Sequence, residues 1–161
     1  MIFSGGVYRD VEFYRTYIRQ ADLVIAADSG GGALLGLDVT PHILVGDMDS
    51  IGRDVFDEIA RRGAEVIEVA PEKDFTDTEL AVKTALERSA TEIVICGALG
   101  DRLDHTLANI SLLVYAQEHG AAARIVTEDQ EVYLLTRDVV NPIAGSLGDT
   151  VSLIALSDPV A

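Results

Sequence analysis

Four stretches of the sequence bring carboxylates together with glycines or with a single cation, a combination suited to binding a metal ion and phosphate groups. They read Asp28-Ser-Gly-Gly-Gly32, Gly46-Asp-Met-Asp-Ser50, Lys73-Asp-Phe-Thr-Asp77 and Gly97-Ala-Leu-Gly-Asp-Arg-Leu-Asp-His105. In the second stretch Asp47 and Asp49 are two residues apart, so in an extended chain their side chains share a face. Two ionised carboxylates about 4 Å apart repel each other by about 4 kcal/mol at an effective dielectric constant of about 20.

Adding Asp28 and Asp77 to this pair would give a cluster that requires either a cation or raised pKa values. Mg²⁺ meets the requirement, because it takes oxygen ligands and shares its coordination shell with substrate phosphates. The alternative is that the aspartates cap helices and tighten turns, which is a common use of Asp. Their recurrence after successive predicted strands favours the metal site.

The first of these stretches, from Asp28 through Ser29, Gly30 and Gly31, precedes a predicted helix whose free N–H groups can hold phosphate. A glycine-rich turn without a ligand is an equally open interpretation of that stretch alone. The sequence contains neither the G-x-x-x-x-G-K-[ST] loop nor the G-x-G-x-x-G fingerprint, so a standard P-loop or dinucleotide site is not supported.

Lys73 and Arg102 are cations within acidic loops, where each can neutralise charge on a transferring phosphoryl group. The alternative is a solvated ion pair with the neighbouring Asp74 or Asp101. His105 follows Asp104 at the start of a predicted helix, where the helix dipole disfavours a cation, so we expect a neutral hydrogen-bonding group.

Short apolar runs alternate with segments of helical periodicity, which predicts the elements that must position these residues. The predicted strands are Met1–Phe3, Leu23–Ala27, Ile43–Val45, Glu65–Val69, Glu92–Cys96 and Ala123–Thr127. The predicted helices are Asp10–Arg19, Gly31–Leu37, Asp54–Arg62, Asp77–Arg88 and Leu103–His119. This alternation predicts an α/β fold, a doubly wound and mostly parallel sheet with helices on both faces. Ligands of such sheets bind beyond the carboxyl ends of the strands, where the four stretches lie.

Local signals refine these helices. Thr76 with Glu79 forms a capping box for the helix that starts at Asp77. Asp54 is expected to cap its own helix, and Gly63 to end it. In the last helix an apolar stripe is formed by Leu103, Leu107, Ile110 and Val114.

Beyond Thr127 the periodicity changes. Glu131–Leu135 and Val151–Leu156 read as strands with no helix between them, so an antiparallel β segment begins near Val132. We therefore expect residues 1–130 to form the α/β domain and residues 131–161 to form the start of an incomplete antiparallel β-sandwich domain.

The composition limits the classes of partner. The net charge of −15 argues against nucleic acid or an anionic membrane as partner, because both require clustered Lys and Arg. No signal peptide and no apolar run near the ~20 residues of a membrane span is found. The single cysteine, Cys96, lies in an apolar run that reads as a buried strand, and a cytoplasmic location is expected.

Together the four stretches resemble the thiamine pyrophosphokinase family, over about residues 21–136 and in the family's order. The resemblance implies an α/β domain that binds ATP and Mg²⁺, followed by a β-sandwich domain. It also implies a homodimer, with thiamine held where the α/β domain of one subunit meets the β domain of the other. The reaction would be attack by the thiamine hydroxyl on the β-phosphorus of ATP, which gives thiamine diphosphate and AMP.

Carried over position by position, the resemblance makes Asp47, Asp49 and Asp77 the metal ligands, with Asp28 assisting directly or through water. Arg102 and Asp104 join these four aspartates as candidate catalytic residues. The candidate nucleotide-binding residues are Ser29, Gly30, Gly31, Ser50, Lys73, Asp74, Thr76, Gly100, His105 and Asn109.

The sequence departs from the family pattern in two places, and two other functions are alternatives to the one that the resemblance implies. The first stretch reads Asp-Ser-Gly where the family has Asp-Gly or Asp-Arg-Gly. The β domain is also short, so residues 1–161 alone are expected to bind nucleotide and Mg²⁺ but to transfer diphosphate poorly or not at all. A D-x-D glycosyltransferase would also use Asp47 and Asp49, but it gives no reason for the third and fourth stretches. A non-catalytic nucleotide-binding domain is the other alternative.

The motif generates one direct prediction. Asp47→Asn or Asp49→Asn should remove Mg²⁺-dependent ATP binding, because each substitution takes one negative charge from the proposed metal site. Titration calorimetry measures the binding, and an unchanged circular dichroism spectrum serves as the control for folding. Binding equal to that of the unsubstituted chain would exclude the residue concerned as a ligand.

Overall fold

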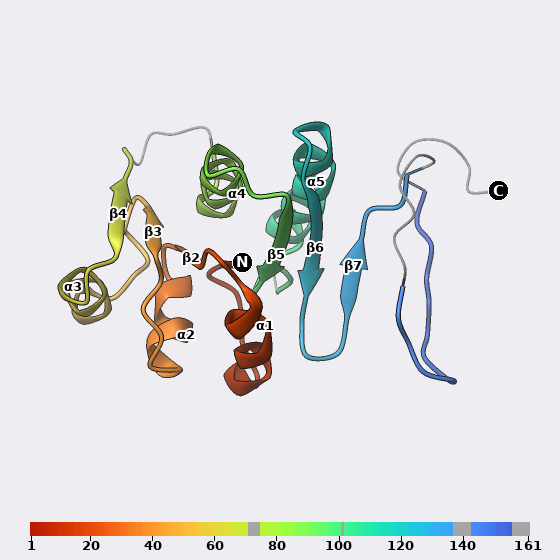
Figure 1. The fold of residues 1–161 in the computed structure, drawn as a ribbon, viewed down its shortest axis with the longest axis horizontal. Helices are drawn as coiled ribbons and strands as arrows, with labels where there is room; N and C mark the ends of the chain where they lie inside the picture. The colour runs from red at the N-terminus through yellow and green to blue at the C-terminus, as the bar shows by residue number, and fades with distance from the viewer. Residues whose placement is uncertain (71–74, 101, 137–142, 156–161) are drawn as a thin grey trace.

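A computed structural model describes residues 1–70, 75–100, 102–136 and 143–155. Its centre is a seven-stranded sheet with the order β4-β3-β2-β1-β5-β6-β7, visible as the row of arrows in Figure 1. The strands are β1 (Ile2–Phe3), β2 (Ile25–Ala27), β3 (Ile43–Gly46), β4 (Glu65–Glu68), β5 (Glu92–Cys96), β6 (Ala122–Val126) and β7 (Glu131–Tyr133). All pairings from β4 across to β6 are parallel, and β7 is antiparallel to β6. The predicted α/β fold with a mostly parallel sheet is confirmed.

The helices cover both faces of this sheet. They are η1 (Val11–Tyr14), α1 (Arg15–Gln20), α2 (Gly30–Gly36), α3 (Arg53–Arg61), α4 (Asp77–Glu87) and α5 (Leu103–Glu118). Each predicted helix is present, although the first begins with a 3₁₀ segment. The alternation of side chains along each strand separates two cores: Ile2 and Ile25 face α4 and α5, whereas Phe3 and Ala26 face the other three α-helices.

The ends of the helices follow local rules with one exception. Thr76 Oγ1 accepts a hydrogen bond from the Glu79 backbone N–H at 3.1 Å, so the predicted cap of α4 is confirmed. Gly63, with φ of 92°, follows the end of α3 as expected. The prediction that Asp54 caps α3 is wrong, because Gly52 occupies the cap position and Asp54 lies inside the first turn. The negative charge of Asp54 still interacts favourably with the helix dipole at that position.

Most of the side chains that α5 buries lie outside its predicted apolar stripe. Leu103 and Leu107 are exposed, whereas Leu112, Leu113 and Ala116 are buried against the sheet. The helix was therefore predicted correctly from a stripe that does not supply most of its buried face. Both sides of α5 carry leucine, so periodicity alone cannot determine which side meets the core.

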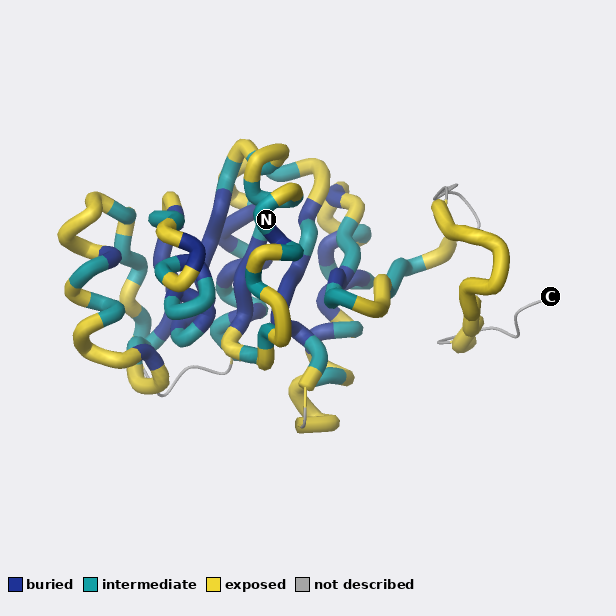
Figure 2. Tube along the Cα trace, turned by 90° about the horizontal axis from the view of Figure 1, so that it is seen from below, coloured by how far each residue is buried: buried dark blue, intermediate teal, exposed yellow. Residues whose placement is uncertain are grey.

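The segment after β6 departs from its prediction. β7 exchanges backbone hydrogen bonds with β6 and so continues the α/β sheet to at least Tyr133, past the predicted boundary at residue 130. Residues 151–155 adopt no strand, so the predicted strand Val151–Leu156 is wrong over its described part. The physical reason is the absence of cover: residues 143–155 are exposed throughout, as the yellow tube in Figure 2 shows, and an unsupported strand is at best marginally stable in water. A second domain in this region stays a prediction.

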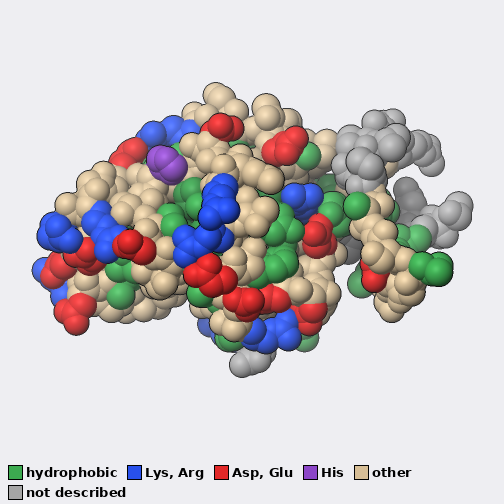
Figure 3. Space-filling model, turned by 60° about the horizontal axis from the view of Figure 1, so that its bottom comes forward, with side chains coloured by type: hydrophobic (Ala, Val, Ile, Leu, Met, Phe, Trp, Pro, Cys, Tyr) green, Lys and Arg blue, Asp and Glu red, His purple; other side chains and the backbone are tan. Residues whose placement is uncertain are grey.

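Charges of both signs lie side by side on one face of the chain (Figure 3). On the face drawn in Figure 3, acidic and basic side chains are interspersed, in keeping with ion pairs such as those that Glu58 makes with Arg61 and Arg62. Within the described ranges, none of the helices has the length and apolar character needed to cross a membrane. Cys96 is fully buried, as predicted, and burial raises the pKa of its thiol.

The order of the strands determines where a ligand can enter. From β1 the chain winds outward through β2, β3 and β4, and then returns to place β5 on the other side of β1. The helix after β1 lies on one face of the sheet and the helix after β5 on the other. The connections that leave these neighbouring strands therefore diverge, which opens a crevice at the carboxyl edge of the sheet.

Candidate metal and phosphate site

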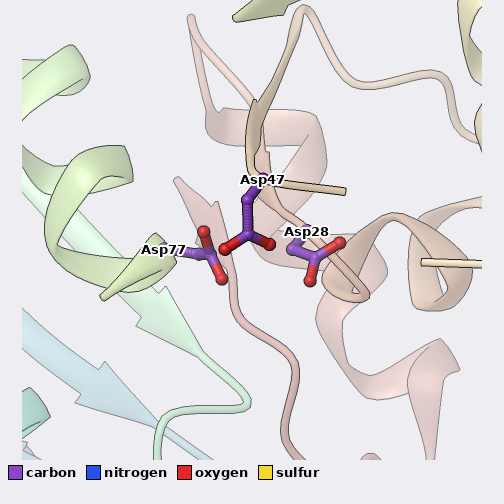
Figure 4. A group of neighbouring side chains, drawn as sticks. All are labelled: Asp28, Asp47 and Asp77. Atoms are coloured by element: carbon purple, nitrogen blue, oxygen red, sulfur yellow. The ribbon is translucent and has the colours of Figure 1, made fainter. Parts of the chain in front are cut away.

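Three carboxylates meet at this edge. Asp28 follows β2, Asp47 follows β3, and Asp77 is the first residue of α4. One oxygen from each residue lies within 4.8 Å of the others, and Figure 4 shows the three side chains next to one another. Residues separated by up to 49 positions, from 28 to 77, are thus brought together by the parallel sheet.

Asp28 is the most constrained of the three. It is 3% exposed, and its φ of 46° lies in the left-handed region, which Asp and Asn tolerate better than most residues. Its Oδ2 accepts a hydrogen bond from the Ser50 backbone N–H at 3.2 Å, whereas its buried Oδ1 has no hydrogen-bond partner within the described part of the chain. Burial, and then the charge of Asp77, raises the pKa of Asp28.

The loop after β3 brings Asp47, but not Asp49, into the group of three carboxylates. Met48 has a φ of 62°, so the stretch from Asp47 to Asp49 is a turn, and the predicted extended geometry is wrong. Asp47 joins the carboxylate group, whereas Asp49 Oδ1 accepts a hydrogen bond from Ser50 Oγ at 2.8 Å. Gly46 lets the Asp28 and Asp77 side chains lie close to the end of β3, because a Cβ on Gly46 would lie 3.0 Å from both Asp28 Cβ and Asp77 Oδ1. The predicted role of Asp49 as a metal ligand stays a prediction.

The carboxylate group fits a hard divalent cation. Three oxygens from three side chains converge, and one buried carboxylate oxygen lacks a hydrogen-bond donor in the described residues. Burying mutually repelling carboxylates is unfavourable unless a cation compensates them. Mg²⁺ accepts such a set, because it binds one or a few carboxylates and completes its octahedron with water and phosphate oxygens.

The group forms one wall of a cavity of about 560 Å³ at the carboxyl edge of the sheet. The loops after β1, β2, β3 and β5 contribute to its lining, together with the first turns of α4 and α5. The predicted site residues that line it are Asp28, Ser29, Asp47, Asp49, Ser50, Thr76, Asp77, Gly100, Arg102, His105 and Asn109. Lys73 and Asp74 were also predicted, but they lie outside the described residues.

Gly30 and Gly31 were expected to contact a nucleotide, but they are buried in the first turn of α2 and do not belong to the lining. A Cβ on Gly30 would overlap the Phe3 carbonyl, and one on Gly31 would lie 2.7 Å from Ile59 Cδ1. These glycines therefore allow the helix to approach β1 and α3 closely. Their contribution to the site is the placement of the Asp28-Ser29 turn that precedes them.

The lining of the cavity also includes a cation. Arg102, at the start of α5, donates to Asp104 through Nε at 3.2 Å and through Nη2 at 2.6 Å, and both side chains are largely exposed. Asp104 itself is not among the lining residues. The Arg102 guanidinium lowers the pKa of Asp104. An exposed pair of this kind is weak, so the guanidinium can exchange its carboxylate partner for a phosphate at little cost.

Two predicted binding residues have structural roles in this conformation. The Asn109 side-chain amide donates to the Ala98 carbonyl at 2.8 Å from a buried position, which ties α5 to the loop after β5. Thr76 caps α4. Each still borders the cavity, so a structural role and a ligand contact are compatible for both residues.

The loop after β1 is a part of the site that the sequence interpretation missed. Ser4, Gly5 and Gly6 line the cavity, and Ser4 Oγ forms a buried hydrogen bond with Thr78 Oγ1 at 2.8 Å. The available signal was the pair Gly5-Gly6 directly after the predicted strand Met1–Phe3. A strand of two residues gave too little pattern to mark its end as one more strand-end loop.

Comparison with known proteins assigns the family. Residues 14–125 match the family model described as "Thiamin pyrophosphokinase, catalytic domain". The chain is 30% identical over 133 residues to the thiamine pyrophosphokinase of Bacillus subtilis. The match covers 83% of this chain and 62% of that protein.

Solved structures agree with this assignment. The crystal structure of the Bacillus subtilis thiamine pyrophosphokinase superposes with a TM-score of 0.69 at 31% identity, and covers 81% of this chain and 61% of that one. A thiamin pyrophosphokinase family protein from Enterococcus faecalis gives a TM-score of 0.69 at 28% identity, with 82% and 62% covered.

An α/β protein with a carboxylate-lined cavity at the switch point of its sheet belongs to the broad class of nucleotide- and metal-binding folds. Within that class, the chain belongs to the thiamin pyrophosphokinase family, through its catalytic domain. It spans about 62% of the length of the Bacillus subtilis relative.

The buried charge of Asp28 and its left-handed backbone conformation generate a prediction. Asp28→Asn should raise the free energy of unfolding in metal-free buffer at pH 8 by about 1 kcal/mol, because it removes a buried charge and keeps a residue that accepts positive φ. The same substitution should abolish Mg²⁺-dependent ATP binding. Urea unfolding measures the first effect and calorimetry the second, with Asp57→Asn, in an exposed ion pair on α3, as the stability control.

The pH dependence follows from the raised pKa of Asp28. Ionisation of a group with a raised pKa destabilises the native state, so the stability difference between the two chains should be full above that pKa. It should close as the pH falls toward the ordinary carboxyl pKa of about 4. A difference that stays constant over this range, or a destabilised Asp28→Asn chain, would contradict the account.

Proposed function

We propose that this chain carries the catalytic domain of an ATP- and Mg²⁺-dependent thiamine pyrophosphokinase, which transfers diphosphate from ATP to the hydroxyl of thiamine. The observation that carries the proposal is the convergence of Asp28, Asp47 and Asp77 in the cavity, in a chain of this family. The hydroxyl oxygen forms a bond to the β-phosphorus, the bond from that phosphorus to the bridging oxygen of the α-phosphate breaks, and AMP departs. The hydroxyl proton passes to water or buffer.

Asp28, Asp47 and Asp77 would hold the cation, with Asp49 beside them. When bound, Mg²⁺ would neutralise phosphate charge and fix the orientation of the polyphosphate. The role of the three carboxylates is to hold it at the strand ends with oxygens that arrive from two loops and one helix. Such a site explains how a chain of net charge −15 can bind an anionic nucleotide.

Arg102 and His105, which also line the cavity, are suited to contacting the phosphates. Arg102 offers a planar fork of donors that matches phosphate oxygens once it leaves Asp104. Lys73, which precedes α4 in the sequence, is proposed to contact phosphate in the same way, and Asp74 is proposed to contribute to nucleotide binding as a hydrogen-bond acceptor. Phosphoryl transfer through a loose transition state requires mainly alignment and charge neutralisation, so the chain needs no strong general base beside the hydroxyl.

The remaining parts of the proposal concern regions beyond the sheet. We propose that the segment from residue 131 leads into a thiamine-binding β domain, although β7 itself belongs to the α/β sheet. A homodimer, with thiamine between the α/β domain of one subunit and the β domain of the other, is part of the same proposal. A cytoplasmic location accords with the single, buried cysteine.

The function is tested by incubating the chain with ATP, Mg²⁺ and thiamine and separating the nucleotides. AMP and thiamine diphosphate should appear in equal amounts, slowly, and only when thiamine is present. Omission of Mg²⁺ is the control for the metal. Formation of ADP, release of AMP without thiamine, or turnover of a sugar nucleotide would each contradict the proposal.

Arg102 provides a prediction about phosphate binding. Arg102→Ala should weaken Mg²⁺-dependent ATP binding by about tenfold to a hundredfold, because a charge-assisted contact to phosphate is lost. The melting temperature should not change, since the pair with Asp104 is exposed. Arg53→Ala removes a comparable exposed ion pair on α3 and should leave ATP affinity unchanged. Equal affinities for the two variants would remove Arg102 from the site.

A further inference from the structure

Backbone hydrogen bonds join the residues after β1 to the end of β5, at the point where the connections that leave these two strands diverge. The Ser4 backbone N–H donates to the Cys96 carbonyl at 2.8 Å, and the Gly6 N–H donates to the Gly97 carbonyl at 3.0 Å. Beyond these contacts one connection leads to α1 and the other to α5, on opposite faces of the sheet. The residues at this fork, from Ser4 to Gly6 and from Gly97 to Gly100, line the cavity.

A tyrosine hydroxyl spans the fork. Tyr8 donates its hydroxyl hydrogen to the Ser4 carbonyl at 2.7 Å and shares it with the Cys96 carbonyl at 3.2 Å, so one group binds the ends of both β1 and β5. Its ring stacks on Phe3 at a centroid distance of 5.6 Å and meets the edge of Tyr14 at 5.4 Å. Burial raises the pKa of Tyr8, which keeps the hydroxyl protonated and able to donate.

The glycines at the fork leave room for the close contact between Tyr8 and the two loops. Gly97 has a φ of 65°, and a Cβ there would overlap the Tyr8 hydroxyl oxygen. A Cβ on Gly6 would overlap the Gly97 carbonyl. The two loops therefore approach each other backbone to backbone, with the Tyr8 oxygen against the Cα of Gly97.

The other end of the same loop is also fixed. The backbone N–H groups of Arg9 and Asp10 donate to Glu128 Oε1 at 2.8 and 3.0 Å, and Arg9 pairs with Asp129 at 2.7 Å. The segment from Ser4 to Asp10 is thus attached to β5 at one end and to the β6–β7 turn at the other. Tyr8 lies between these attachments and does not belong to the lining of the cavity.

We propose that Tyr8 is a positioning residue for the polyphosphate chain of the nucleotide: its hydroxyl sets the separation of the Ser4–Gly6 and Gly97–Gly100 loops, which flank the bound phosphates. The proposal rests on the proposed function, since it assumes that a nucleotide occupies the cavity. The metal-binding carboxylates lie after β2 and β3 and at the start of α4, outside the fork. Loss of the Tyr8 hydroxyl should therefore affect the nucleotide and spare the cation.

The test compares Tyr8→Phe with Tyr17→Phe in the full chain. Tyr17 is also half-buried, and its hydroxyl lies 3.3 Å from Glu131 Oε1, away from the cavity. Calorimetry measures the affinity for ATP with Mg²⁺ in the absence of thiamine, and separately the affinity for Mg²⁺ alone. Both variants are compared at a temperature at which circular dichroism finds them folded.

Tyr8→Phe is expected to weaken ATP binding about tenfold, equivalent to about 1.4 kcal/mol, and to leave Mg²⁺ affinity within twofold. Tyr17→Phe should leave both affinities within twofold. ATP affinity of Tyr8→Phe equal to that of Tyr17→Phe would overturn the proposal, as would a parallel loss of ATP and Mg²⁺ affinity, which indicates a general structural role. Failure of the unsubstituted chain to bind ATP with Mg²⁺ would instead overturn the proposed function on which the inference rests.

Discussion

The convergence of negative charge at the carboxyl edge of the sheet is the constraint on which the rest of the structure depends. Asp28 is buried beside Asp77 and Asp47, and one of its oxygens has no hydrogen-bond donor among the described residues. Such a group destabilises the folded chain unless a cation joins it. The hydrophobic layers on both faces of the sheet supply the stability that allows this arrangement to persist, which is the usual relation between a functional site and its scaffold.

The scaffold achieves this convergence through close backbone approach. Parallel strands end at one edge, so the residues that follow β2 and β3 lie at the same edge as the first turn of α4. Gly46 lets the Asp28 and Asp77 side chains come within van der Waals reach of the backbone, and Gly30 lets α2 lie against β1. A Cβ on Gly46 would press on the Asp28 and Asp77 side chains, and one on Gly30 would overlap the Phe3 carbonyl, so either substitution would disturb the packing that places the carboxylates.

The cavity joins two electrostatic environments that a ligand must satisfy together. The lining includes the three carboxylates and also Arg102 and His105 at the start of α5. A divalent cation bound to an anionic polyphosphate would match both kinds of group, with the metal at the carboxylates and phosphate oxygens at the hydrogen-bond donors of α5. This complementarity favours the phosphoryl-transfer function over a role in which the acidic loops merely cap helices. It also accounts for how a protein of net charge −15 could take the anionic ligand that we propose.

The sequence by itself determined the α/β fold, the position of nearly every strand and helix, and the loops that carry chemistry, because strand ends, caps and hydrophobic periodicity are local properties of the chain. Only the tertiary structure decided which carboxylates meet. The left-handed residue Met48 makes the stretch from Asp47 to Asp49 a turn, of which only Asp47 joins the group of three carboxylates, and the depth of the sheet buries Asp28. Likewise, Leu103 and Leu107 form a regular stripe, yet packing buried the other side of α5, and residues 151–155 found no neighbouring strand to pair with. Each of these outcomes depends on contacts between residues distant in sequence, which local periodicity does not specify.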